Sequence, residues 1–478
     1  MKIVAAAREE EIHLTIANIF QHPKLVNLAT VAQFSQHEGE QKSIQPFSLL
    51  STTQRDYLLH AIPENTSNVN GNDIIDILPT TWMQNLFISR GVNIQPLAFN
   101  YFFLNLGTRV DASRLRSSIP TLVQQFSILR TKFVYVDGVL WQTVLRKPHV
   151  PFTEFHLDMS LEEAADTVCL EDSRTTDPLE LATAFMLIRG NSNEHLLAIR
   201  ITHAQYDGVC FPSFVKALFA IYSGKSVEPA HNHSTYLAYT RERKSVSALH
   251  WRDVLHGSRM TKATPLLSPS IRHGMIPVEV QTENIIDMPH VPTGLTLASL
   301  VSAAWAKVLS QITGEEDVVY GYMVAGRNAN IPTISKIVGP CLNIIPVRAR
   351  LHAKTTSTEL IRSIQEQYIA LGEADSMGFD EIVRTSTDWP ADTEYDSVFQ
   401  HQNLNEHPEF DFEGTSSRLH WFQNPDSVPC ILTVVSYPLE DGLRIVVRGN
   451  EHIITPESAE RINKLLCETI GALSSSLQ

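Results

Sequence analysis

The sequence predicts an α/β protein built from two lobes of similar size, and three observations lead to this prediction. Strand-like apolar runs alternate with helical patterns along most of the chain. A turn-rich break at residues 228–234 separates two such series. The length of 478 residues exceeds the roughly 150 residues of an average domain. Each series of strands and helices is therefore expected to fold as one α/β lobe.

The segment before the first lobe has a different character. Residues 1–10, 14–20 and 25–31 carry short helical patterns, and three short helices bury little surface by themselves. Residues 1–33 are therefore expected to be part of a larger domain. Residues 34–72 are rich in Ser, Thr, Gln and Asn and are predicted to be a linker.

The first lobe is expected to span residues 73–230. Its apolar residues recur every three or four positions in some stretches and every second position in others, which separates helices from strands. The predicted elements are a strand at 101–106, a helix at 115–126, a hairpin at 133–144 that turns at Asp137–Gly138, a strand at 195–202, and a helix at 214–221 that ends at Gly224.

The second lobe is expected to span residues 231–478. Its most evident element is a long apolar helix at 297–312 with Gly314 just beyond its end, since glycine commonly ends helices. The other predicted elements are strands at 317–324, 344–349, 431–437 and 443–448 and a closing helix at 457–473.

Composition excludes several classes of function. With 52 acidic and 38 basic residues and a net charge of −14, the chain does not favour a nucleic-acid partner. It has no apolar run of the roughly 18 residues that a membrane helix needs. The five cysteines are scattered, and the pair His231-x-His233 has no third ligand beside it, so no metal site is predicted. A cytoplasmic protein is expected.

One short motif carries chemistry. His203 and Asp207 belong to a His-x-x-x-Asp-Gly loop that begins where a predicted strand ends, a common place for active-site residues. Histidine titrates near neutral pH and suits a general base or a group that orients the substrate. Asp207 is expected to turn away from the substrate and pair with a distant cation. Alternatively, His203 is a core or loop histidine and Asp207 only forms a turn.

Two stretches before this loop and three after it, together with the loop, resemble the ordered core motifs of condensation domains of nonribosomal peptide synthetases. They are residues 77–84, 128–133, 317–321, 325–327 and 338–343. Trp251 lies in a Trp-Arg-x-x-Leu element similar to one in fungal members, and residues 397–403 are similar to a stretch of fungal terminal and siderophore-type domains. The resemblance extends from about Asp73 to the C-terminus.

The resemblance implies two chloramphenicol-acetyltransferase-like lobes in a V-shaped pseudo-dimer, with a tunnel between them and His203 in mid-tunnel. It also implies that Asp207 pairs with Arg327 of the Ala-Gly-Arg motif as a structural contact. Gly208 is a candidate oxyanion donor, with a turn glycine as the alternative. The remaining substrate candidates, each with a plain packing role as its alternative, are Tyr206, Thr202, His401 and Asn403.

The first 33 residues resemble the C-terminal part of a peptidyl carrier domain. The serine that receives 4′-phosphopantetheine in this family lies upstream of such a helix and is absent here. The resemblance therefore implies that the lobes bind no cofactor of their own. The phosphopantetheine is expected to arrive on a carrier domain, fused upstream, that holds a linear peptidyl thioester.

One departure from the family pattern indicates a subtype. Thr202 precedes His203 where most condensation domains have a first histidine, and fungal terminal domains usually have serine there. No carrier-like or adenylation-like region follows before Gln478. The expected reaction is release of the peptide by intramolecular amide formation. An intermolecular condensation between two carrier-bound substrates and a non-catalytic docking module remain alternatives, and a coenzyme A or dihydrolipoyl acyltransferase is a more distant one.

Overall fold

The computed structural model describes residues 44–477 except 269–276, 332–333, 373 and 404–406, together with residues 3, 7, 10, 12–14, 18–19, 22 and 24–34. The helices predicted at residues 1–10 and 14–20 lie largely outside the described residues. The predicted helix at 25–31 is present as α3 (Leu25–Val31). Beside it, β1 (Ile12–His13) pairs antiparallel with β2 (Gln33–Phe34).

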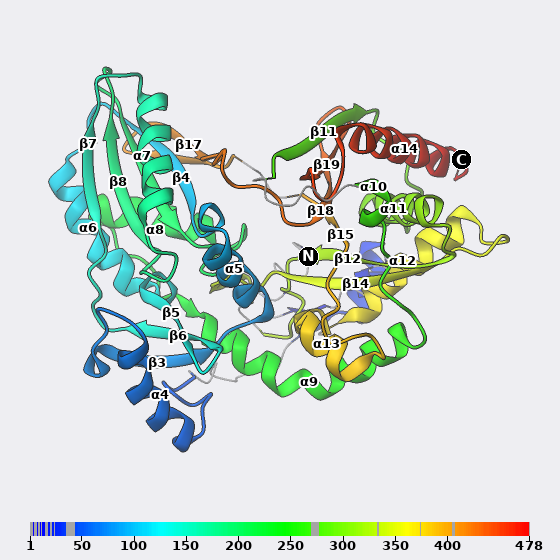
Figure 1. The fold of residues 1–478 in the computed structure, drawn as a ribbon, viewed down its shortest axis with the longest axis horizontal. Coiled ribbons are helices and arrows are strands. Elements are labelled where there is room, and N and C mark those ends of the chain that lie inside the picture. Colours follow the sequence, from blue (N-terminus) through cyan, green and yellow to red (C-terminus); the bar gives the residue numbers. More distant parts are fainter. Residues whose placement is uncertain are drawn as a thin grey trace.

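Two α/β lobes diverge from the long helix α9 (His233–Leu255), as predicted from the alternating pattern (Figure 1). The first lobe is built on a six-stranded sheet with helices on both faces. Its strands, in spatial order, are β16 (Glu409–Phe412), β17 (Thr415–Trp421), β4 (Asn100–Gly107), β9 (His195–Ile201), β8 (Ala184–Arg189) and β7 (Phe152–His156). Helices α6 (Ala112–Gln125) and α8 (Phe211–Tyr222) share one apolar core with this sheet, and α7 (Leu161–Thr175) shares another.

A smaller sheet lies beneath the first lobe. Its strands are β3 (Ile74–Pro79), β6 (Val139–Leu145) and β5 (Thr131–Val136), and Asp137–Gly138 form the predicted turn between β5 and β6. Helix α4 (Thr52–Asn65) packs on this sheet through Leu58, Ala61 and Ile62. The prediction of a linker at 34–72 is therefore wrong for residues 52–65, because a capping box between Ser51 and Gln54 starts a helix there.

The second lobe has its own six-stranded sheet. The strands, in spatial order, are β11 (Glu279–Ile286), β19 (Leu443–Asn450), β18 (Leu432–Pro438), β15 (Ser397–His401), β12 (Asp317–Val324) and β14 (Asn343–Arg350). Helices α11 (Leu297–Thr313), α12 (Ser357–Leu371) and α14 (Pro456–Ser475) share one apolar core with this sheet. The predicted long helix is confirmed, and Gly314 ends it with a φ of +74°.

Shorter elements complete the chain. They are α5 (Trp82–Asn93), α10 (Thr264–Leu267), α13 (Phe379–Ser386), β10 (His231–Asn232), β13 (Ile337–Val338), and the 3₁₀ turns η1 (Gly71–Asp73), η2 (Gln95–Leu97), η3 (Ser127–Arg130), η4 (Ile334–Lys336) and η5 (Ala374–Ser376). No helix of the described residues is both long enough and apolar enough to cross a membrane.

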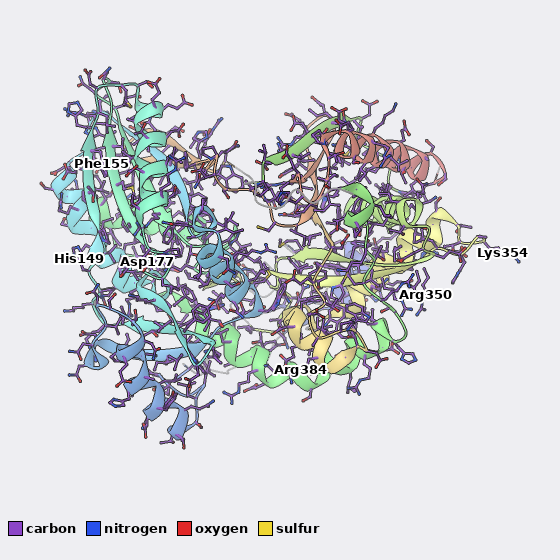
Figure 2. The ribbon with its side chains drawn as sticks, viewed as in Figure 1. His149, Phe155, Asp177, Arg350, Lys354 and Arg384 are labelled. Atoms are coloured by element: carbon purple, nitrogen blue, oxygen red, sulfur yellow. The ribbon has the colours of Figure 1, made fainter. Side chains whose placement is uncertain are left out.

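The lobes are joined by more than the chain connection at residue 230. Strand β17 lies at 415–421, in the part assigned to the second lobe, yet it pairs antiparallel with β4 of the first lobe. Strand β10, directly after this connection, pairs in parallel with β13. The predicted boundary between 230 and 231 therefore does not hold for β16 and β17. Figure 2 shows the side chains on both lobes, with Phe155 on the first and Arg384 on the second.

Candidate active site

The histidine loop begins directly after β9. The imidazole Nδ1 of His203 lies 3.2 Å from the backbone oxygen of Tyr206. Because a carbonyl oxygen only accepts hydrogen bonds, the neutral ring carries its hydrogen on Nδ1. Nε2 then keeps its lone pair and is the nitrogen able to accept a proton.

Two aromatic rings enclose the imidazole. The ring of Phe87 lies 4.3 Å from that of His203 with an angle of 2° between the planes, and the ring of Tyr206 lies 4.6 Å away with an angle of 8°. Burial lowers the pKa of His203 below its usual value, although hydrogen bonds and the charge of Asp207 oppose this. The imidazole is therefore neutral at pH 7, as a base must be.

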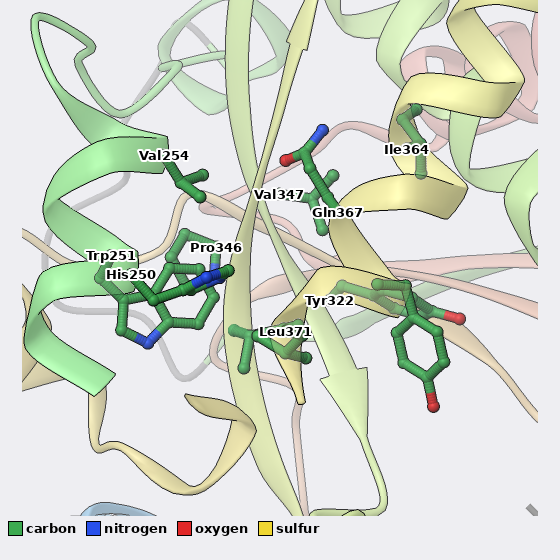
Figure 3. Close-up of a pocket in the computed structure, with 11 residues that line it drawn as sticks. His250, Trp251, Val254, Tyr322, Pro346, Val347, Ile364, Gln367 and Leu371 are labelled. Atoms are coloured by element: carbon green, nitrogen blue, oxygen red, sulfur yellow. The ribbon is translucent and has the colours of Figure 1, made fainter. Parts of the chain in front are cut away.

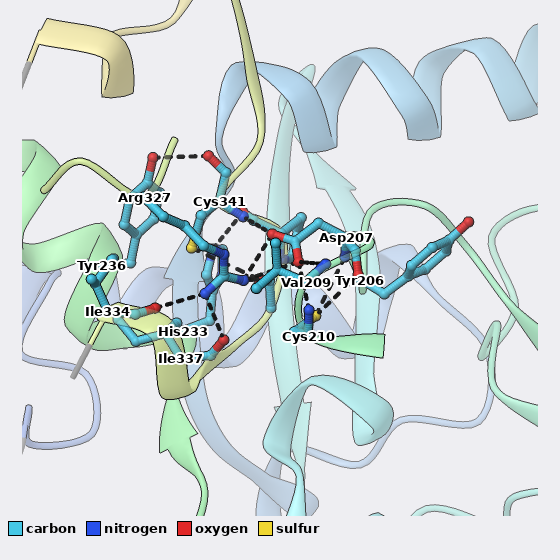
Figure 4. Close-up of polar contacts among 12 residues, drawn as sticks. Tyr206, Asp207, Val209, Cys210, His233, Tyr236, Arg327, Ile334, Ile337 and Cys341 are labelled. Atoms are coloured by element: carbon cyan, nitrogen blue, oxygen red, sulfur yellow. Dashed lines mark hydrogen bonds and ion pairs between the residues drawn. The ribbon is translucent and has the colours of Figure 1, made fainter. Parts of the chain in front are cut away.

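Asp207 contacts Arg327 (Figure 4). Nη2 of Arg327 donates to both carboxylate oxygens, at 3.0 and 2.8 Å, and the two residues are only 3% and 7% exposed. Burial raises the pKa of Asp207, but Arg327 and the backbone N–H groups of Cys341 and Cys210 bring it below its usual value. Since Asp207 belongs to the first lobe and Arg327 to the second, this ion pair ties the loop to both.

The surroundings of Arg327 bring together residues from three separate stretches of the sequence. Gly326 has a φ of +62°, and a Cβ at that position would lie 1.7 Å from the oxygen of Cys341. His233, predicted as a loop residue, is the first residue of α9 and is buried. Its Nε2 lies 3.0 Å from the oxygen of Pro340. No spacing in the sequence indicates that His233 and Pro340 meet.

A cavity of about 1990 Å³ lies between the lobes and includes the histidine loop. It is larger than the roughly 300–1,000 Å³ of pockets for small ligands. The predicted residues that line it are His203, Tyr206, Asp207, Gly208, Arg327, His401 and Asn403. Among the described residues, no group of three or more side chains is placed to hold a metal ion.

The substrate candidates occupy different positions around this cavity. The hydroxyl of Tyr206 accepts a hydrogen bond from Asn100 Nδ2 at 2.9 Å, which fixes its ring. Nδ1 of His401 lies 2.8 Å from the hydroxyl of Ser436, and burial lowers the pKa of His401 to about 4. Thr202 is only 2% exposed and does not line the cavity. Its Oγ1 accepts from the backbone N–H of Ala204 at 3.5 Å, and a contact of Thr202 with substrate stays a prediction.

A second, much smaller pocket lies in the second lobe, between α9 and α12 (Figure 3). Its volume is about 10 Å³, which is about the room that one water molecule needs. Trp251, singled out in the sequence, lines this pocket and is almost fully buried, with its indole N–H donating to the oxygen of Ala374 at 3.1 Å. Trp251 thus packs α9 against the second lobe.

Comparisons with known proteins agree with this geometry. A family model described as "Condensation domain" matches residues 75–473. Over its full length the chain is 99% identical to nonribosomal peptide synthetase TES of Alternaria alternata, of which it covers 9%, and 37% identical to nonribosomal peptide synthetase dtxS1 of Metarhizium robertsii, of which it covers 6%. The chain thus spans less than a tenth of these curated relatives.

Solved structures share the fold. A structure described as "holo T3CT" has a TM-score of 0.75 and 27% identity, and the match covers 90% of this chain and 98% of that one. A starter condensation domain of the rhizomide synthetase RzmA has a TM-score of 0.67 and 16% identity over 84% of this chain and 96% of that chain. The second likeness concerns the fold alone.

Proposed function

Because the chain belongs to the condensation-domain family of nonribosomal peptide synthetases, we propose that it releases a carrier-bound linear peptidyl thioester by intramolecular amide formation. Amide-bond formation is the activity of the family, and the fold of two chloramphenicol-acetyltransferase-like lobes confirms the prediction from sequence. The cyclising outcome and the identity of the carrier-bound substrate are the parts that we propose.

The observation that carries the proposal is the position of His203. Its Nε2 is the basic nitrogen, because Nδ1 is held by the oxygen of Tyr206, and the residue lines the cavity between the lobes. The amine nitrogen attacks the thioester carbon, a C–N bond forms and the C–S bond breaks. Nε2 of His203 takes the proton from nitrogen and returns it to the departing sulfur, giving an amide and a free thiol.

Other residues have supporting roles in this proposal. Gly208 lines the cavity beside His203, and its N–H is a candidate donor to the developing oxyanion. The ion pair of Asp207 and Arg327 holds the loop and touches no reacting atom. His401 and Asn403 line the same cavity and are candidates to contact the peptide.

The size of the cavity supports a peptidyl substrate. About 1990 Å³ leaves room for a peptide chain whose amine end folds back toward its thioester end. Holding both ends in one enclosed space raises the effective concentration of the amine by orders of magnitude. Enclosure also protects the thioester from water.

The partners follow from the same proposal. We propose that residues 1–33 belong to a peptidyl carrier domain and that 4′-phosphopantetheine on the complete carrier presents the peptide. The five cysteines form no disulfide, which suits a reducing compartment, and we place the reaction in the cytoplasm.

The test uses the chain joined to its complete carrier domain, loaded with a synthetic linear peptidyl pantetheine. Mass spectrometry follows cyclic, hydrolysed and dimeric products for the wild type and His203→Ala. We expect the cyclic product from the wild type and a loss of roughly 10²–10⁴-fold in the variant. Equal cyclisation by both proteins would indicate a docking module, and product formed only with a second carrier-bound amine would indicate intermolecular condensation.

A further inference from the structure

Helix α5 is fastened to the histidine loop although about 120 residues separate them in sequence. Gln84 is fully buried, and its Nε2 donates to the oxygen of Ala204 and to Oε1 of Gln142, both at 2.9 Å. Its Oε1 accepts the N–H of Thr81 in a capping box at the start of α5. One side chain therefore fixes the helix start, the small sheet and the histidine loop together.

Phe87 lies three residues further along α5, nearly one turn beyond Gln84. This spacing places both residues on the same side of the helix. The hydrogen bonds of Gln84 thus hold the ring of Phe87 over the imidazole of His203, and the planes of the two rings are parallel within 2°. Tyr206 covers the opposite face of the imidazole and is itself held by Asn100.

A ring with parallel neighbours on both faces cannot rotate about its Cβ–Cγ bond without striking one of them. The bond from Nδ1 to the oxygen of Tyr206 fixes the orientation within the plane. Together these contacts set the direction in which Nε2 of His203 points. Tyr206 belongs to the loop itself, so Phe87 is the contact that comes from a separate element.

We propose that Phe87 is a positioning residue, which acts through His203 by clamping the imidazole plane so that Nε2 faces the reacting atoms. The inference rests on the proposed function in one respect, namely that His203 takes the proton. It also assigns a role to residues 77–84, which include the start of α5: they hold in place the helix that bears Phe87.

The experiment compares Phe87→Leu and Phe87→Trp in the chain joined to its loaded carrier domain. Leucine keeps an apolar side chain without a flat face, whereas tryptophan restores one. Phe155→Leu is the matched control, because Phe155 is also half-buried in the first lobe but does not line the cavity. Single-turnover cyclisation gives the first-order rate constant of ring closure, and NMR of ¹³C-labelled histidine, with His203 assigned from His203→Ala, reports the tautomer and ring environment.

We expect the single-turnover rate constant of Phe87→Leu to fall about 3- to 10-fold, since a stacked pair contributes on that scale. The imidazole signal of His203 should shift in Phe87→Leu and lie near its original place in Phe87→Trp, and Phe155→Leu should match the wild type. An unchanged His203 signal in Phe87→Leu overturns the clamp whatever the activity. Full cyclisation by His203→Ala overturns the proposed function. In that case the NMR signal of His203 still shows whether Phe87 holds the imidazole in place.

Discussion

Removing the carboxylate of Asp207 tests the link between the lobes most directly. In Asp207→Ala the guanidinium of Arg327 stays buried at 7% exposure and loses its only carboxylate partner among the described residues. The backbone N–H groups of Val209, Cys210 and Cys341, at 3.1, 2.8 and 3.0 Å from the carboxylate, lose their acceptor as well. Breaking a buried ion pair in this way costs about 3–5 kcal/mol.

The thermal midpoint should therefore fall by about 6–20 °C, at about 2–4 °C per kcal/mol for a unit of lobe size. Differential scanning fluorimetry measures this shift. Glu154→Ala is the matched control, because Glu154 forms an exposed ion pair with Arg116 at 2.6 Å, and such pairs contribute at most about 1 kcal/mol.

A double-mutant cycle completes the test. In Asp207→Ala with Arg327→Met no buried charge is left unpaired, so the double variant should lose clearly less than the sum of the two single losses. A midpoint of Asp207→Ala within 2 °C of the wild type, or strictly additive losses, would refute the idea that this ion pair holds the lobes together.

Two further results are expected. Burial lowers the pKa of His233 to about 4, whereas the pKa of an unfolded histidine is about 6.5. Between pH 6.5 and pH 4, His233 therefore binds a proton in the unfolded chain but not in the folded one. The free energy of unfolding should then decrease by about 2 kcal/mol at this site from pH 7 to pH 5, and urea titrations of His233→Gln should lack that part of the decrease. Gly326→Ala should lower the thermal midpoint much more than Gly257→Ala. Both positions have positive φ, at +62° and +68°, but only the first adds a clash with a backbone oxygen, so equal shifts would contradict the geometry.

Local patterns predicted much of the fold correctly. The helix at 297–313 has an apolar stripe long enough to be unmistakable and a glycine at its end. The hairpin of β5 and β6 turns at an Asp-Gly pair, a strong hairpin pattern. Both features depend only on residues that are close together in the sequence, so local patterns are enough to predict them.

The missed features depend on contacts or on weak patterns. Helix α4 buries only Leu58, Ala61 and Ile62, so its polar composition suggested a linker. Strand β17 pairs with β4, and the paired residues lie 315–319 positions apart in the chain, so no local periodicity shows such a pairing. For the same reason the stacking of Phe87 on His203 was not predicted.

The candidate site was predicted unevenly. A family resemblance named both Asp207 and Arg327, and the structure places them in contact. Thr202 adjoins His203, but adjacent residues after a strand point in different directions, and Thr202 is buried away from the cavity. The cavity wall includes residues 206–209 of the same loop, but much of it is formed by residues of the second lobe that lie far away in the sequence.

The passage of residues 409–421 into the sheet of the first lobe has a practical consequence. A gene cut at residue 230 would yield two fragments that are each incomplete. The upstream fragment would expose the hydrogen-bonding groups of β4, an open strand edge that invites aggregation. The downstream fragment would keep the pairing of β16 with β17 but would lack β4, the strand on which β17 pairs in the first lobe. Separate expression should therefore give poorly behaved pieces, whereas co-expression should allow them to complement each other. Any domain exchange should move residues 51–475 together, because α4 packs on the small sheet and α14 ends at Ser475.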